Sequence, residues 1–224
     1  MHITLLCNAG LAIECDGSVL LVDLPNCDLP PFAWLAQGEW RRILDQMPPY
    51  DRVCGIYYSH NHPDHCDTLR LEEYRKRYPE IPVFFPDDRP FKGTAVMGPF
   101  VISYERIDHA PMDAPAPPHV VSWIRANGTC IYIAADAKLD PDAHRAFLKG
   151  RVADGAFWNA MYLSRPETRL LMKESAVNNW IYHMPDQNPD PYGIWKKCNN
   201  NLARYPEDLK MVHILSEYPS EIEL

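Results

Sequence analysis

One short stretch, from Ser59 to Asp67, constrains this chain more than any other part of its sequence. It reads Ser-His-Asn-His-Pro-Asp-His-Cys-Asp, so that three histidines and two aspartates crowd together. It directly follows an apolar run, residues 53–58, that is typical of a buried strand. Neutral imidazole and carboxylate groups are ligands of zinc and of harder first-row metals. The sequence therefore predicts a metal site at the end of a strand.

The overall composition is that of an ordinary globular protein. Its 224 residues suffice for one large core, and we expect a single domain over residues 1–224. The net charge of −8 disfavours nucleic acid as a partner, because a phosphate backbone requires a basic surface. No apolar run approaches the ~20 residues of a membrane span. The first residues lack the basic region and the cleavage pattern of a signal peptide, so none is expected.

The cysteines indicate a reducing environment. There are 7 of them, an odd number, and no two are arranged as C-x-x-C. Several lie in apolar, strand-like runs, where a free thiol acts as a small hydrophobic group. We therefore expect a cytoplasmic protein and not a disulfide scaffold.

The remaining pattern predicts strands, many of them in hairpins, interleaved with helices. Turns at Asn8-Ala9-Gly10 and Asp16-Gly17-Ser18 separate short β-rich runs near the start of the chain, and Ala126-Asn127-Gly128 separates two more in its second half. Strands are expected over 3–7, 11–15, 19–22, 53–58, 83–85, 101–107, 120–125, 130–135, 155–158, 180–182 and 211–215. Helices are expected over 32–46, 67–78, 140–149 and 166–177, and within 191–205. This order predicts an α/β domain with mixed or antiparallel sheets, and no nucleotide-binding glycine motif is present.

Three more ligand-type residues follow predicted strands. His109 comes after 101–107, Asp136 after 130–135, and His183 after 180–182. Taken singly, a histidine in such a place is usually a surface residue, and an aspartate is usually a turn or cap residue. Together with the cluster they indicate one site at the ends of several strands, where layered α/β folds place their functional residues.

These residues together resemble the metal-binding motifs of the metallo-β-lactamase-fold hydrolases. The motif H-x-H-x-D-H stands intact at residues 60–65, and His109, Asp136 and His183 follow in the family's order. The opening hairpin, up to Asp23, is also similar. The resemblance covers nearly the whole chain. It implies an α/β (α+β) fold, a four-layer αββα sandwich, with two divalent metal ions at one edge.

On that resemblance, seven residues are expected to hold the metals: His60, His62 and His109 the first ion, Asp64, His65 and His183 the second, and Asp136 both. A bridging carboxylate offsets the repulsion between two nearby cations, which together activate a water molecule near neutral pH. Asp64 is also expected to serve in catalysis. Zinc is the expected metal, and manganese or iron would also suit these ligands.

Two positions depart from the common family pattern. Ala135 stands before the bridging aspartate, where many members have glycine, so its backbone angle must permit alanine. Asp67 replaces a common glycine, and the ending His65-Cys66-Asp67 is similar to the branch of ascorbate-phosphate lactonases and N-acyl-phosphatidylethanolamine phospholipase D. Asp67 is expected to orient a ligating imidazole, to cap the following helix, or both.

Other side chains have less specific roles. Cys66 is expected to be a buried free thiol, with metal ligation as the alternative. His119 is expected to be a solvent-exposed loop histidine, with leaving-group protonation as the alternative. Arg106, Lys138 and Arg165 are weak candidates for holding a phosphate or carboxylate. The aromatic side chains near the predicted site are expected to pack in the core unless they wall a pocket: Trp34, Trp40, Trp158 and Tyr162.

The expected function is metal-dependent hydrolysis of a small ester-type substrate. The branch resemblance favours a phosphodiester or a phosphorylated lactone. The alternatives are a thioesterase or another lactonase of the same fold, or a non-catalytic metal-binding sensor or scaffold. A small molecule is the expected partner, and a homodimer is the default assembly.

Overall fold

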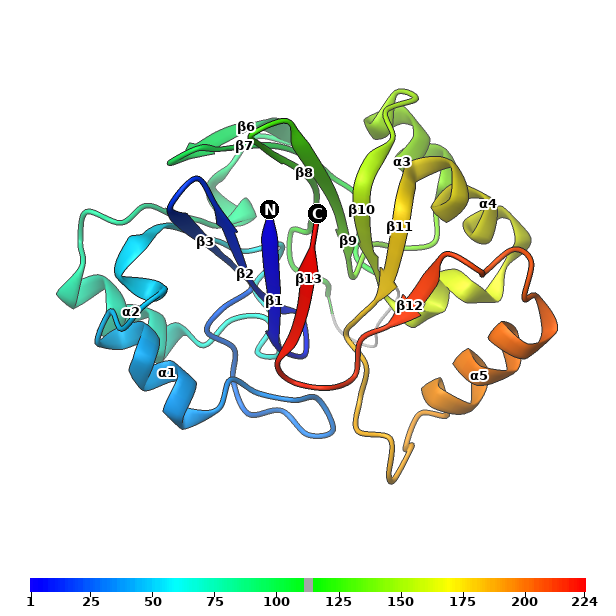
Figure 1. Cartoon of the computed structure of the whole chain (residues 1–224), viewed down its shortest axis with the longest axis horizontal. Coiled ribbons are helices and arrows are strands. Elements are labelled where there is room, and N and C mark those ends of the chain that lie inside the picture. The colour runs from blue at the N-terminus through cyan, green and yellow to red at the C-terminus, as the bar shows by residue number, and fades with distance from the viewer. Residues whose placement is uncertain (111–114) are drawn as a thin grey trace.

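The chain forms two stacked β-sheets with helices on both outer faces (Figure 1). The computed structural model describes residues 1–110 and 115–224. The N- and C-termini lie side by side, and the Met1 ammonium donates a hydrogen bond to the carbonyl of Leu224 at 2.6 Å. The predicted four-layer αββα sandwich is confirmed.

The first sheet carries the metal-type cluster at the end of one of its strands. Its order is β13-β1-β2-β3-β4-β5. The strands are β1 (His2–Cys7), β2 (Gly10–Cys15), β3 (Ser18–Val22), β4 (Val53–Tyr57), β5 (Val83–Phe84) and β13 (Ser220–Glu223). Between β2 and β3, Asp16 and Gly17 have positive φ angles of 48° and 71°, as a tight hairpin turn requires. β3, β4 and β5 run parallel, so their carboxyl ends meet at one edge.

The second sheet supplies the other strand ends. Its order is β12-β11-β10-β9-β8-β7-β6. The strands are β6 (Lys92–Met97), β7 (Phe100–Arg106), β8 (Val120–Ala126), β9 (Thr129–Ala135), β10 (Ala153–Trp158), β11 (Ala176–Ile181) and β12 (Val212–Ile214). The strands from β9 to β12 are parallel, whereas β6 to β9 form antiparallel hairpins. Both sheets therefore mix the two pairing modes, as predicted.

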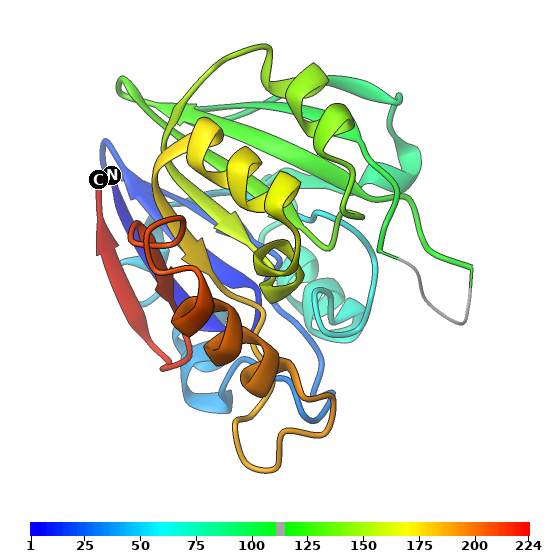
Figure 2. The ribbon, with the colours of Figure 1, turned by 90° about the vertical axis from the view of Figure 1, so that its right-hand side faces the viewer.

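The helices cover the sheets from both sides. α1 (Gln37–Leu44) and α2 (Thr68–Arg77) lie on the first sheet. α3 (Pro141–Leu148), α4 (Pro166–Ser175) and α5 (Ile194–Arg204) lie on the second, and they face the viewer in Figure 2. Short 3₁₀ turns occur at Tyr50–Arg52, Pro86–Asp88 and Ala160–Ser164.

Strand alternation explains why four layers form. In β9, Ile131 and Ile133 point into the core between the sheets, whereas Tyr132 and Ala134 point into the core beneath the second sheet's helices. A strand with apolar side chains on both faces must be covered on both faces. Each fully buried aliphatic side chain of this kind contributes roughly 1.5–3 kcal/mol of burial free energy.

Several element boundaries differ from the sequence expectation. The first helix begins at Gln37 and not near residue 32, because residues 24–36 form an extended loop with Pro25, Pro30 and Pro31. α4 ends at Ser175, and β11 begins with the next residue, so that this strand is longer than expected. The prediction missed β6 and β13. Both are edge strands with exposed side chains in alternation, and neither shows a strong apolar pattern.

Among the described residues, no helix is long and apolar enough to cross a membrane.

The predicted capping role of Asp67 gives a stability test. Its carboxylate accepts hydrogen bonds from the backbone N–H groups of Leu69 and Arg70, both at 3.0 Å. Asp67→Ala should lower the free energy of unfolding by about 1 kcal/mol, measured in urea with a chelator present. Asp67→Asn should retain most of the stability, because asparagine caps as well as aspartate. Equal losses in both variants would show that the charge, and not the cap, is what matters.

Candidate metal centre

The predicted ligands come together at one edge of the sandwich, on loops that leave four different strands. β4 leads into residues 60–65, β7 into His109, β9 into Asp136, and β11 into His183. The side-chain ligand atoms form two groups, and within each group every pair of atoms lies within 4.8 Å. The structure thus brings together all seven residues that the sequence singled out.

The first group contains three histidines. The ring centroids of His60 and His62 are 4.8 Å apart, those of His60 and His109 5.0 Å, and those of His62 and His109 4.7 Å. The Nε2 atoms of His60 and His109 are buried and make no hydrogen bond within the described part of the chain. Buried polar atoms in folded proteins are nearly always satisfied, so three imidazoles that converge in this way fit a cation between them.

The second group combines imidazole and carboxylate. Nε2 of His183 lies 3.0 Å from Oδ2 of Asp64 and 3.0 Å from Nε2 of His65. Nε2 of His65 lies 3.8 Å from the same Asp64 oxygen. These oxygen and nitrogen atoms match the ligand preferences of zinc and of other first-row divalent ions.

The Asp136 carboxylate lies between the two groups. Its Oδ2 atom is 3.7 Å from Nε2 of His60 and 3.5 Å from Nε2 of His109. The same oxygen is 3.3 Å from Nε2 of His65 and 3.4 Å from Nε2 of His183. One carboxylate oxygen therefore faces histidines of both groups, which is the placement that a bridging ligand requires.

Hydrogen bonds on the far side of the rings fix which nitrogen of each histidine faces the centre. Asp23, fully buried, accepts from the Ser59 N–H at 2.7 Å, from the Ser59 hydroxyl at 2.8 Å and from Nδ1–H of His65 at 3.0 Å. Because the Ser59 hydroxyl donates to Asp23, its oxygen accepts from Nδ1–H of His60 at 2.9 Å. Nδ1–H of His109 donates to the carbonyl of Ala110 at 2.7 Å. All three histidines are thereby left with Nε2 toward the centre.

Burial and nearby opposite charges together set the protonation of the side chains at the centre. Burial lowers the pKa of His60 and of His62, so both favour the neutral form that binds metals. For His183, burial acts against protonation, but the carboxylates of Asp136 and Asp64 outweigh it and raise the pKa to about 10. For Asp64, burial opposes the charge, but His65 and His183 lower the pKa to about 2.

The backbone turns sharply at three of the strand ends. Asp23, Ala135 and His183 have positive φ angles of 51°, 46° and 57°, values that are uncommon outside glycine. Ala135 therefore adopts the left-handed conformation, so the backbone at this position does permit alanine. Such conformations cost of order 1–3 kcal/mol and persist only where the surrounding structure imposes them.

The sequence missed part of the support for this site. Asp23 was noted only as a strand end, yet it, and not Asp67, accepts from a site histidine; Asp67 acts as the helix cap. Asn8 was assigned only to a turn. Its side-chain Nδ2–H donates to the backbone carbonyl of Asp64 at 3.2 Å, and its backbone carbonyl accepts from the His183 N–H at 3.1 Å. Only contacts between distant segments reveal these roles.

The structure also shows the surroundings of Cys66 and His119. Cys66 is a buried free thiol as expected, and burial raises its pKa to about 12. The expectation of an exposed histidine at 119 is wrong: His119 is only 2% exposed, and burial lowers its pKa to about 3. The proline-rich loop before it includes residues 113 and 114, which lie outside the described residues.

The three basic residues proposed to hold a phosphate or carboxylate either bond to other groups or lie away from the ligand side chains. Arg106 donates to the carbonyls of Pro86 and Arg89, and Lys138 pairs with Asp108 at 2.7 Å. Arg165 lines a separate hollow beside α3 and α4. The aromatic candidates pack in the core except for one exposed side chain, Trp34, which lies under the Arg70 guanidinium; the buried ones are Trp40, Trp158 and Tyr162.

Comparison with known proteins supports the fold. No protein-family model and no curated protein matches the sequence. Among solved structures, "a possible metal-dependent hydrolase" from Veillonella parvula is similar along 100% of this chain and 99% of its own, with a TM-score of 0.72 and 14% identity. The metallo-β-lactamase-fold protein YhfI from Bacillus subtilis matches over 99% of this chain and 98% of its own, with a TM-score of 0.67 and 15% identity.

This chain has the metallo-β-lactamase fold. A third similar structure is Zn²⁺-bound PqqB from Methylobacterium extorquens, with a TM-score of 0.62 and 11% identity over 100% of both chains. At such low identities the likeness establishes the architecture only. The function of this chain therefore has to be inferred from its own side chains.

Removing the hydroxyl of Ser59 tests whether the network behind the histidines prepares the site. Ser59→Ala takes away the acceptor for Nδ1–H of His60 and should weaken zinc binding roughly 10–100-fold, as measured by competition with a chromophoric chelator. Ser122→Ala is the matched control, because Ser122 is equally buried but pairs with the Tyr57 hydroxyl. Wild-type affinity in Ser59→Ala would refute the orienting role.

Proposed function

We propose that this protein is a dinuclear metal-dependent hydrolase that acts on a small ester-type substrate. The observation that carries the proposal is the position of Asp136, whose carboxylate oxygen faces two groups of convergent ligand side chains. Three residues would hold the first ion (His60, His62 and His109), three the second (Asp64, His65 and His183), and Asp136 both.

The ligand chemistry favours catalysis over a purely structural metal. In a structural zinc site, one ion is usually surrounded by four protein ligands, most of them cysteine or histidine. Here the candidate ligands are histidine and aspartate only, and the neighbouring Cys66 thiol is buried and protonated. A pair of bound divalent ions would supply a water activated as hydroxide near neutral pH and positive charge against the substrate oxygen.

The chain's own residues have distinct tasks in this proposal. The two aspartates, Asp64 and Asp136, bring negative charge that offsets the repulsion between neighbouring cations. Asp64 belongs to the second group, and its carboxylate would also act directly in catalysis. Asp23 and Ser59 keep the imidazoles turned so that no ring rearrangement accompanies the reaction.

Among ester-type substrates we favour a phosphodiester over a phosphorylated lactone. A phosphorylated lactone needs a second cationic site for its phosphate group, and the three basic candidates near the ligand loops are engaged elsewhere or lie aside. In a phosphodiester the anionic group is also the reacting group, so the bound ions would satisfy it themselves. The other family reactions, thioester and simple lactone hydrolysis, remain alternatives for the same centre.

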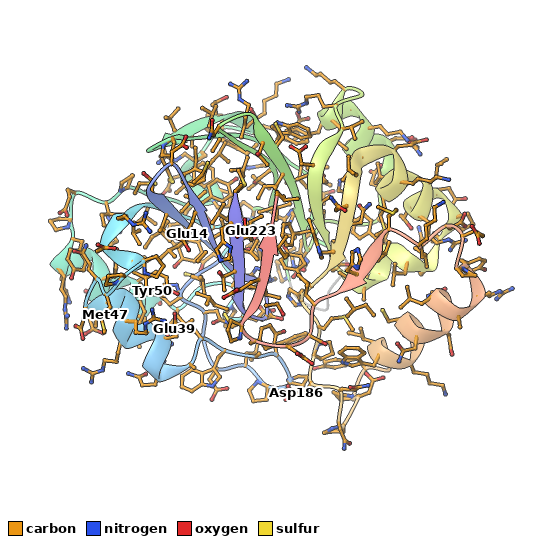
Figure 3. All side chains as sticks on the ribbon, in the orientation of Figure 1. Glu14, Glu39, Met47, Tyr50, Asp186 and Glu223 are labelled. Atoms are coloured by element: carbon orange, nitrogen blue, oxygen red, sulfur yellow. The ribbon has the colours of Figure 1, made fainter. Side chains whose placement is uncertain are left out.

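The loops beside the second group suit an uncharged substituent. Residues 24–36 and 184–193 contain no Lys or Arg, and their three carboxylates (Asp28, Asp186 and Asp190) would repel a second anionic group. The Phe32 ring lies edge-on to the ring of His183, with centroids 4.8 Å apart, and the partly exposed Tyr192 ring is stacked beside it. The Asp186 N–H donates to the carbonyl of Pro31 at 2.7 Å and so joins the two loops; Asp186 is labelled below Glu223 in Figure 3. An apolar leaving group fits this side.

Other features of the proposal follow from the composition. We propose zinc as the metal, with manganese or iron able to use the same ligands. The free thiols support a cytoplasmic location, and we propose one domain over the whole chain and a homodimer as the working assembly.

Metal content and activity test the function directly. The purified protein should contain close to two divalent ions per chain by mass spectrometry and should hydrolyse bis-p-nitrophenyl phosphate. Asp64→Ala and Asp136→Ala should each abolish turnover in protein that remains folded, because each removes a proposed ligand. Asp142→Ala is the control, since it deletes a carboxylate whose side chain is 96% exposed on α3. Activity unchanged in both site variants, or folded protein that binds no metal, would exclude this function.

Zinc binding should release protons. Because nearby carboxylates raise the pKa of His183 to about 10 and that of His65 well above its usual value, protons occupy the metal-free centre at pH 7. A cation must displace them, so the apparent affinity should rise with pH. Calorimetry in two buffers of different ionisation enthalpy measures the number released. The same heat in both buffers, showing no release at pH 7, would contradict these shifted values.

A further inference from the structure

His119 is a buried histidine close to the centre that belongs to neither ligand group. It stands immediately before β8, and its ring centroid lies 5.2 Å from that of His60 and 5.8 Å from that of His109. Its proximity raises the question of whether it binds a metal, delivers a proton or holds another residue in place.

The hydrogen bonds of the ring answer that question. Nδ1 lies 2.9 Å from the carbonyl oxygen of Ile107, which can only accept, so Nδ1 carries the proton. Nε2 lies 3.1 Å from the backbone nitrogen of Asp136, which can only donate, so Nε2 supplies the lone pair. Both ring nitrogens are therefore used by the backbone, and neither is left to bind a cation or to pass a proton to a leaving group.

The two partners belong to two different ligand loops. Ile107 precedes His109 by two residues, and Asp136 faces both ligand groups. The next residue along from His119, Val120, donates its N–H to the carbonyl of Ser59 at 3.0 Å, beside His60. The short segment 119–120 is thus tied to the loops after β4, β7 and β9, all of which carry candidate ligands.

A row of hydrogen bonds joins the loop after β7 to the loop after β9, and the bond from the Asp136 N–H to His119 is at its buried end. Farther out, the Ala110 N–H donates to the carbonyl of Asp136 at 2.7 Å, and the Lys138 N–H donates to the carbonyl of Asp108 at 2.8 Å. The Asp136 N–H donates to His119 and the Asp136 carbonyl accepts from Ala110, so both backbone polar groups of Asp136 are fixed. This matters because the preceding residue, Ala135, is held at a φ of 46°, a conformation that relaxes where contacts do not impose it.

We infer that His119 is a positioning residue: it holds the Asp136 peptide, through Nε2, so that the carboxylate faces both ligand groups. This inference rests on the proposed dinuclear site. It assigns to His119 neither metal ligation nor proton transfer. The part of the ring that matters is a hydrogen-bond acceptor at the position of Nε2.

Three substitutions separate the two ends of the ring. In His119→Gln, the side-chain oxygen can reach the Nε2 position and accept from the Asp136 N–H. In His119→Asn, the shorter amide can donate to the carbonyl of Ile107 but offers no acceptor to Asp136. In His119→Phe, the ring volume stays and both hydrogen bonds are lost.

Zinc affinity should follow the acceptor and not the ring. Competition with a chromophoric chelator should give His119→Gln an affinity close to that of the wild type. His119→Asn and His119→Phe should bind roughly 10–100-fold more weakly, as is typical when a group that orients a ligand is lost. Near-wild-type affinity in His119→Phe would overturn the inference, because packing alone would then suffice. Loss of one whole ion in His119→Gln would make His119 a ligand and would also overturn it.

A spectroscopic measurement on the wild type covers the case in which the variants do not fold. Nitrogen-15 chemical shifts of the His119 ring should show the Nδ1–H tautomer in both metal-free and zinc-loaded protein, with little change at Nε2. A large change at Nε2 on zinc loading would show ligation instead. Failure of the wild type to bind zinc at all would count against the proposed dinuclear site, whereas normal zinc binding with the wrong tautomer would count against His119 alone.

Discussion

Imidazole nitrogens and carboxylates are gathered at one buried edge of the sandwich, and the free-energy cost of burying them together is the constraint on which the rest of the structure depends. A single oxygen of Asp136 lies within 3.3–3.7 Å of four histidine nitrogens, and Nε2 of the fully buried His60 has no hydrogen bond to any described residue. Buried polar groups without partners cost free energy that a folded domain of marginal stability can rarely spare. A bound cation would turn this cost into a gain. The edge is therefore best understood as a site built for metal at the expense of local stability.

Buried residues behind the ligand side chains hold the ligand loops in place and so offset part of this cost. Asp23 accepts three hydrogen bonds and thereby connects β3 with the loop after β4, and Asn8 connects the first hairpin with the loop after β11. His119 occupies the same place for the loops after β7 and β9. Each of these residues is buried and each joins segments far apart in the sequence. The two sheets thus act as a rigid frame, and the strained backbone at Ala135 and His183 is held by that frame.

The local sequence predicted most of the architecture, and the family resemblance singled out the seven candidate ligands that the structure brings together. Apolar alternation, the turn at Asp16-Gly17 and the cap at Asp67 act within a few residues, so the hairpins and α2 were predicted closely. The edge strands β6 and β13 were not, because their pairing with β7 and β1 depends on neighbours and not on their own apolar pattern. The non-helical course of residues 32–36 was missed for a similar reason: Asn26 holds this part of the loop through the Leu35 N–H and the Ala33 carbonyl.

What the sequence determined by itself was the chemistry: which side chains could bind metals, and that their loops follow strands. Only the tertiary structure decided how those side chains face one another. Which nitrogen of His60 or His65 points inward is set by Asp23, and the direction of the Asp136 carboxylate by a peptide that His119 contacts. Residue type is a local property that can be read along the chain. Orientation results from hydrogen bonds between segments that become neighbours only when the two sheets stack.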